Sequence, residues 1–115
     1  MDITIEYKQS QTEAKTLWES HCHAKYELIC VLDGNITITI EGRNFQLTKN
    51  HFAVISPLDF HSVSINDSSV YKRVTVLFGE DDVPKQVRDS FTARAKTNPV
   101  VYHPYNQQIF SQLPN

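Results

Sequence analysis

The sequence predicts an all-β domain, an antiparallel sandwich or barrel of about eight short strands with a short helical segment after it. Three observations predict this fold class. In short segments of the first 80 residues, apolar side chains recur at every second position. Turn-forming residues separate these segments. A crossover between parallel strands would require a helical pattern of about ten residues, and none occurs in this region.

The alternation is clearest at residues 36–40, where three isoleucines share one face of a strand and two threonines share the other. Residues 28–32 are apolar throughout, so this strand is expected to be apolar on both faces. Its outer face then needs a cover, which is either the later helix or a partner subunit. The expected strands are residues 3–8, 14–20, 26–32, 36–41, 45–48, 52–56, 61–65 and 71–78.

The pattern changes after Gly79. The acidic run 80–82 is expected to begin a helix, and Val87, Phe91 and Ala95 recur at the spacing of one helical face over residues 84–96. Residues 100–102 predict a further strand, and residues 107–113 resemble the opening turns of another helix. We therefore expect one domain, with a barrel at 1–80 and a helical or linker extension at 81–115 that packs on it. The unfinished helical stretch suggests the front half of a longer protein.

Composition limits the possible partners. The 115 residues suffice for one domain, and 11 basic against 13 acidic residues give a net charge of −2 with a pI of about 6.2. That charge has the wrong sign for a surface that neutralises many phosphates, so we expect no nucleic acid to be bound by this chain alone. The longest apolar run has five residues, which predicts neither a signal peptide nor a membrane span. A cytoplasmic location without membrane contact is expected.

Four residues form a candidate site. His21, His23 and Glu27 all have odd numbers, so an extended segment would place them on one face. His61 follows Pro57 at the start of a later strand, where antiparallel pairing would bring it opposite the other three. Imidazoles and a carboxylate are ligands for divalent Mn, Fe, Ni or Zn. The alternative is that two histidines at this spacing are ordinary surface or pocket-lining residues.

The spacing of these residues resembles the cupin family. Its first motif, His-x-His, three or four residues, Glu, six residues, Gly, is met by His21, His23, Glu27 and Gly34. The second motif departs from the family pattern, because the step from Pro57 to its histidine is one residue short. This short form resembles the amino-terminal sensor domains of AraC-type transcription regulators, over about residues 18–78.

The resemblance implies a jelly-roll β-barrel that binds a small effector and often helps to form a homodimer. In such regulators a separate carboxy-terminal unit holds DNA, and that unit is absent from this chain. The first hypothesis is therefore an effector-binding module lined by His21, His23, Glu27 and His61. The second is an enzyme in which the same residues hold a metal, and the third is an interaction domain with a filled core. The shortened second motif favours the first and predicts that any metal binds weakly.

Overall fold

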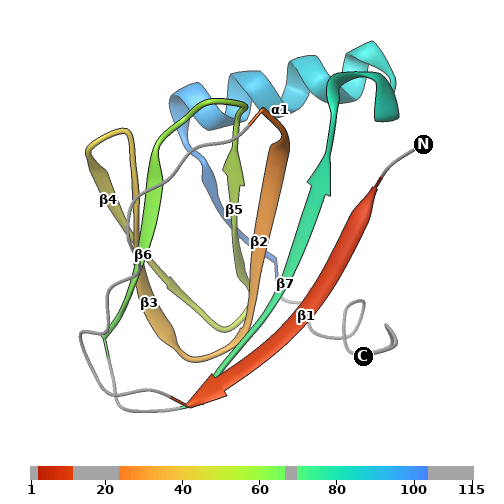
Figure 1. Ribbon diagram of the computed structural model, residues 1–115. Coiled ribbons are helices and arrows are strands. Elements are labelled where there is room, and N and C mark those ends of the chain that lie inside the picture. Colours follow the sequence, from red (N-terminus) through yellow and green to blue (C-terminus); the bar gives the residue numbers. More distant parts are fainter. Residues whose placement is uncertain (1–2, 12–23, 67–69, 104–115) are drawn as a thin grey trace.

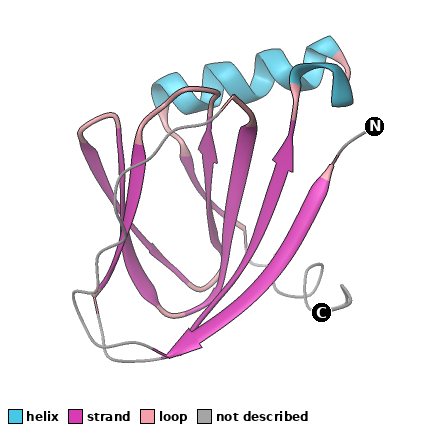
Figure 2. Ribbon diagram, in the orientation of Figure 1, coloured by secondary structure: helices cyan, strands magenta, loops and turns pink. Residues whose placement is uncertain are grey.

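The computed structural model describes residues 3–11, 24–66 and 70–103 (Figure 1). Within these ranges the chain is mostly β, with one α-helix and one short 3-10 helix (Figure 2). The elements are β1 (Thr4–Gln11), β2 (Tyr26–Asp33), β3 (Asn35–Ile40), β4 (Arg43–Thr48), β5 (His51–Ile55), β6 (His61–Ile65), β7 (Val70–Phe78), η1 (Glu80–Asp82), α1 (Lys85–Thr97) and β8 (Val100–Tyr102).

The strands form two antiparallel sheets, one of five strands in the order β1-β7-β2-β5-β8 and one of three in the order β4-β3-β6. The sheets face each other and enclose the core, as Figure 1 shows. The predicted all-β class with a short helical segment is confirmed. No helix in the described part of the chain is both long and apolar enough to cross a membrane.

The space between the sheets holds the main core. Residues on the inner face of β3, which were predicted from the period of two, are completely buried: Ile36, Ile38 and Ile40. They meet the odd-numbered residues of β2, Ile29 and Val31, from the facing sheet. Because both inner faces carry branched aliphatic side chains, they pack together and exclude water from this part of the interior.

The outer face of β2 is apolar as well, as the sequence indicated. Cys30 and Leu32 form a second cluster with Val74, against which partly buried residues of β1, β2, β5 and β7 pack. At the beginning of β2, the ring of Tyr26 stacks on Phe78 and meets the edge of Phe91 from α1. The helix therefore supplies part of the cover that this face requires.

The boundaries of the predicted elements agree with the structure to within a few residues, with three qualifications. The acidic run forms the separate helix η1, in which the Gly79 amide donates to Asp82 Oδ2 at 2.7 Å, and α1 begins only after Pro84. Val87 is 39% exposed, so it does not share the buried face of Ala95 as the spacing suggested. The strand expected at 14–20 and the helical turns expected at 107–113 lie outside the described residues.

Candidate functional site

Two of the four predicted site residues face each other across the interior. Glu27 lies near the beginning of β2 and His61 is the first residue of β6. The distance from His61 Nε2 to Glu27 Oε1 is 3.4 Å, and the two residues are only 1% and 7% exposed. A carboxylate and an imidazole are thus held together at one end of the space between the sheets, where few polar groups are buried.

His61 was predicted to meet Glu27 through antiparallel strand pairing, and this prediction was wrong. β6 does not pair with β2, because His61 is opposite Ile40 of β3 in the three-stranded sheet. Glu27 belongs to the other sheet, where it is opposite Ile55 on β5 and Leu77 on β7. The two side chains meet because the sheets stack face to face, so the contact is made through the core and not along a hydrogen-bonded ladder.

The loop before β6 fixes the His61 ring. The Asp59 amide donates to the Ser56 carbonyl at 3.2 Å, and Leu58 adopts a left-handed φ of 67° within this turn. The turn brings the Asp59 carbonyl to 3.0 Å from His61 Nδ1. Since a carbonyl only accepts hydrogen bonds, Nδ1 carries the proton, and Nε2 is the nitrogen that faces Glu27.

The environment of His61 acts on its pKa in two directions. Burial is the largest influence and favours the neutral ring. The hydrogen bond to Glu27, the hydrogen bond to the Asp59 carbonyl and the charges of both residues favour the protonated ring. Together they outweigh burial, so the pKa of His61 lies above its ordinary value.

The other predicted site residues, His21 and His23, lie outside the described residues. In the ranges that the structure describes, no three His, Cys, Asp or Glu side chains come together as a metal site. Nε2 of His61 and the Glu27 carboxylate are suitable ligand atoms for two positions of a divalent metal. The hydrogen bond from Nδ1 to a backbone carbonyl is also typical of a metal-binding histidine.

The remaining histidines make local contacts. His51 Nδ1 lies 3.2 Å from both the amide and the hydroxyl of Thr48, and its ring lies 5.2 Å from that of Tyr102. His103 is exposed, and its amide donates to the Asn50 carbonyl at 2.8 Å. Both positions lie at the β4–β5 turn and the end of β8, at the opposite ends of these strands from His61.

A polar strip on the inner side of β1 and β7 was not predicted. Tyr71 is buried in the core between the sheets, and Arg73, two residues further along β7, lies on the same face, its guanidinium 5.5 Å from the Tyr71 ring. Burial is the main cause that raises the pKa of Tyr71 to about 12. On β1, Lys8 is opposite Arg73 and forms an ion pair with Glu6 at 3.2 Å. The period of two along residues 71–75 was the signal for this strip.

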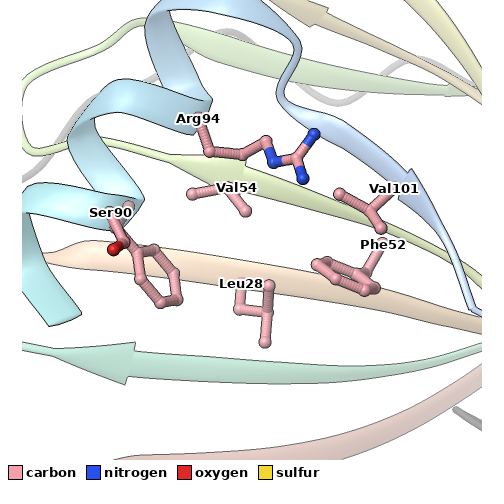
Figure 3. A pocket seen from close by; sticks show the side chains of 7 residues that line it. Leu28, Phe52, Val54, Ser90, Arg94 and Val101 are labelled. Atoms are coloured by element: carbon pink, nitrogen blue, oxygen red, sulfur yellow. The ribbon is translucent and has the colours of Figure 1, made fainter.

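A groove between α1 and the outer face of the five-stranded sheet was also missed. Its volume is about 340 Å³, and most of its lining is apolar (Figure 3). The signal in the sequence was the run of apolar residues at 28–32. This run required that the outer face of the strand be covered, but it did not show how closely the covering helix would pack against the strand. The lining residues are Leu28, Phe52, Val54, Ser90, Phe91, Arg94 and Val101.

Comparison with solved structures identifies the fold. A cupin protein from Bacteroides fragilis is similar with a TM-score of 0.63 and 18% identity, over 73% of this chain and 71% of that one. A protein from Photorhabdus luminescens gives a TM-score of 0.58 and 24% identity, over 83% and 73%. A predicted oxalate decarboxylase from Thermotoga maritima gives 0.56 and 12%, over 63% and 64%. The fold is therefore cupin-like, as predicted.

Sequence comparison adds a family. The family of AraC-like ligand binding domains matches residues 6–114, which is nearly the whole chain. No curated protein matches the sequence significantly.

Proposed function

Because this chain belongs to the family of AraC-like ligand binding domains, we propose that it is the effector-sensing domain of an AraC-type transcription regulator. In this proposal a small polar molecule binds between the two sheets, at the end where Glu27 and His61 meet. The observation that carries the proposal is the contact of these two residues, at 3.4 Å, in an otherwise apolar interior. Burying a carboxylate and an imidazole costs free energy. A core that served only to stabilise the fold could have apolar side chains at these two positions instead.

The polar strip supports a polar effector. Arg73, Glu6 and Lys8 lie on the inner side of β7 and β1, so the face that continues from Glu27 carries both charge signs. Small-molecule sites usually combine apolar walls with a few such directional groups. The strip and the Glu27–His61 pair can therefore provide donors and acceptors to one ligand, such as a polyol or a small hydroxy acid. In the proposal, His21 and His23 line the same space.

A metal-dependent enzyme is the second candidate. The observation that favours it is that Glu27 and His61 present a carboxylate and an imidazole Nε2 to the same point. With His21 and His23 they would complete a set of three imidazoles and one carboxylate, and the metal would activate water or polarise a substrate. The shortened step from Pro57 to His61 argues against tight binding, because a catalytic metal needs all its ligands accurately placed.

The quaternary and DNA-binding parts of the proposal have separate tests. We propose a homodimer, since Ile5 of β1 and Ile3 just before it are 52% and 39% exposed, and β1 pairs only with β7 among the described strands. Sedimentation at high protein concentration should show dimers, and a strictly monomeric chain would contradict this point.

We also propose that the chain alone does not select a DNA sequence. Submicromolar, sequence-selective binding near physiological salt would contradict that proposal.

The effector site is tested by a ligand screen with matched variants. Thermal shifts of the chain are recorded with polyols, sugars, hydroxy acids and amino acids, and ligands that stabilise it are titrated calorimetrically. Glu27→Gln should weaken their binding tenfold or more, whereas Asp89→Asn on the exposed side of α1 should leave it unchanged. Failure of every compound to bind, or equal binding to Glu27→Gln, would contradict the proposed site.

The enzyme alternative is tested with Zn²⁺ and Ni²⁺. Calorimetry on the wild type and on His23→Ala should show weak binding, because the second motif is shortened. Tight stoichiometric binding that is lost in His23→Ala would overturn the sensor proposal in favour of the enzyme.

A further inference from the structure

The groove between α1 and the sheet has the form of a small-molecule site. It lies on the outer face of the sheet, where Leu28, Phe52 and Val54 form the floor and Val101 of β8 extends it. Its volume of about 340 Å³ lies at the lower end of the range of roughly 300–1,000 Å³ that is usual for ligand pockets. It therefore suits a compound of one or two rings.

The walls of the groove are fixed by contacts outside it. The Tyr26 hydroxyl lies 3.2 Å from Thr92 Oγ1, and Arg43 Nη2 donates to the Ala95 carbonyl at 3.1 Å. These bonds tie two points of α1 to β2 and β4. On the sheet side, the Val54 amide donates to the Pro99 carbonyl at 2.8 Å and holds the start of β8. The groove is thus preformed, which lowers the entropy cost of binding.

One cation lies above this apolar floor. In Figure 3 the Arg94 side chain leaves α1, passes over Val54 and brings its guanidinium toward Val101. Arg94 is exposed, and within the described residues no hydrogen bond or ion pair to it is found. Its neighbours in the groove are hydrocarbon side chains and Ser90, so no carboxylate of the lining neutralises it.

We propose that this groove is a second ligand site, which binds a small aromatic carboxylate. The ring system lies against Leu28, Phe52 and Val54, and the carboxylate accepts two hydrogen bonds from the Arg94 guanidinium. A planar guanidinium suits a carboxylate because both its donors point the same way. The site is separate from the proposed effector site, because even-numbered β2 residues line the groove and odd-numbered ones, including Glu27, face the interior.

The test uses 1-naphthoate as the probe, with 1-naphthylmethanol as its neutral counterpart. Amide chemical shifts should change at Ser90, Val54 and Val101 when naphthoate is added, and those near Glu27 and His61 should not. Naphthoate should bind more tightly than the alcohol. Changes confined to the Glu27–His61 end, or no binding at millimolar probe, would overturn the groove site while leaving the effector proposal to its own test.

Variants separate the charge from the cavity. Arg94→Gln should weaken naphthoate binding tenfold or more and leave binding of the alcohol unchanged. Lys96→Gln removes the same charge from the same helix, outside the groove lining, and should affect neither probe by more than twofold. Ser90→Leu, at an exposed position where folding is not at risk, should fill the rim and weaken both probes. Equal naphthoate affinity in Arg94→Gln and the wild type would overturn the assigned role of Arg94.

Discussion

The inner and outer faces of the five-stranded sheet are both apolar along β2, but they are covered in different ways. A second sheet covers the inner face, and the side chains of the two layers interdigitate until residues such as Ile38 are fully buried. Among the described residues, α1 covers part of the outer face, and a groove of about 340 Å³ is left beside it. A sheet follows the twist of the sheet beneath it, whereas a straight helix meets a twisted sheet along one line. The same apolar pattern is therefore tightly packed around Ile38 on one side and leaves a groove on the other.

The largest expected effect concerns Cys30, which is fully buried on the outer face and packs beside Leu28 and Phe52 of the groove floor. Burial raises the pKa of this thiol from 9.0 to about 12, so below pH 9 it should hold about a thousandfold less thiolate than an exposed cysteine. In a Cys22→Ser background, which leaves Cys30 as the only thiol, alkylation of the native chain at pH 8 should be slower than that of the urea-unfolded chain by a factor of this order. Comparable rates would show that the outer face is open at Cys30.

The same pKa gives a pH dependence of stability. Because the folded chain holds the Cys30 proton more tightly than the unfolded chain, deprotonation favours unfolding. This contribution is intact below pH 9 and is lost as the pH rises toward 12. Between pH 9 and pH 12 the urea midpoint should therefore fall less in Cys30→Ala than in Cys22→Ser. An unchanged fall would contradict the raised pKa.

The next effect compares matched truncations on the two faces. Ile38→Ala and Leu28→Ala remove the same number of carbon atoms, from the filled core and from the groove floor respectively. We expect Ile38→Ala to lower the free energy of unfolding by roughly 2–5 kcal/mol, since it opens a new cavity. Leu28→Ala should cost about 1 kcal/mol, because its side chain is only partly buried. Urea denaturation measures both, and similar losses would contradict the difference between the faces.

A smaller effect is expected where α1 is tied to the sheet. Tyr26→Phe keeps the ring stack on Phe78 and removes the hydroxyl that lies 3.2 Å from Thr92 Oγ1. The expected loss is about 0.5–1.5 kcal/mol of unfolding free energy. A double-mutant cycle with Thr92→Val isolates this bond. A coupling energy of zero would show that the helix is held by its apolar contacts alone.

The smallest effect is expected on the exposed side of the helix. Lys85 Nζ and Asp89 Oδ2 are 2.7 Å apart, but both side chains are mostly in water. Asp89→Asn should therefore change the free energy of unfolding by no more than about 0.5 kcal/mol. A larger loss in urea denaturation would show that this exposed ion pair, and not only the packing of the sheets and α1, contributes to the stability of the fold.

The sequence predicted those features of the fold that depend on neighbouring residues. The period of two placed Ile36, Ile38 and Ile40 on one buried face and the two threonines between them on the other face. These predictions succeeded because an extended strand alternates its side chains whatever its partners are. The apolar run at 28–32 likewise predicted a covered outer face.

Features that depend on packing between layers were not predictable in the same way. The position of His61 opposite Glu27 depends on which strands share a sheet, and the sequence pattern carries no information on that pairing. The spacing of Val87, Phe91 and Ala95 predicted one buried helix face, yet Val87 is exposed and Ala95 is buried. The groove beside Arg94 depends on the distance between α1 and the sheet, which is set by remote contacts such as that of Arg43 with Ala95.

The affinity of the best-stabilising screened ligand for the wild type, Glu27→Gln and Asp89→Asn tests the central claim most directly, since that claim is an effector site between the sheets at Glu27. All three chains are first checked for cooperative urea unfolding, so that a lost site is not confused with a lost fold. Calorimetry should then give the same Kd for the wild type and Asp89→Asn and a Kd at least ten times higher for Glu27→Gln. One common Kd for all three chains would contradict the account.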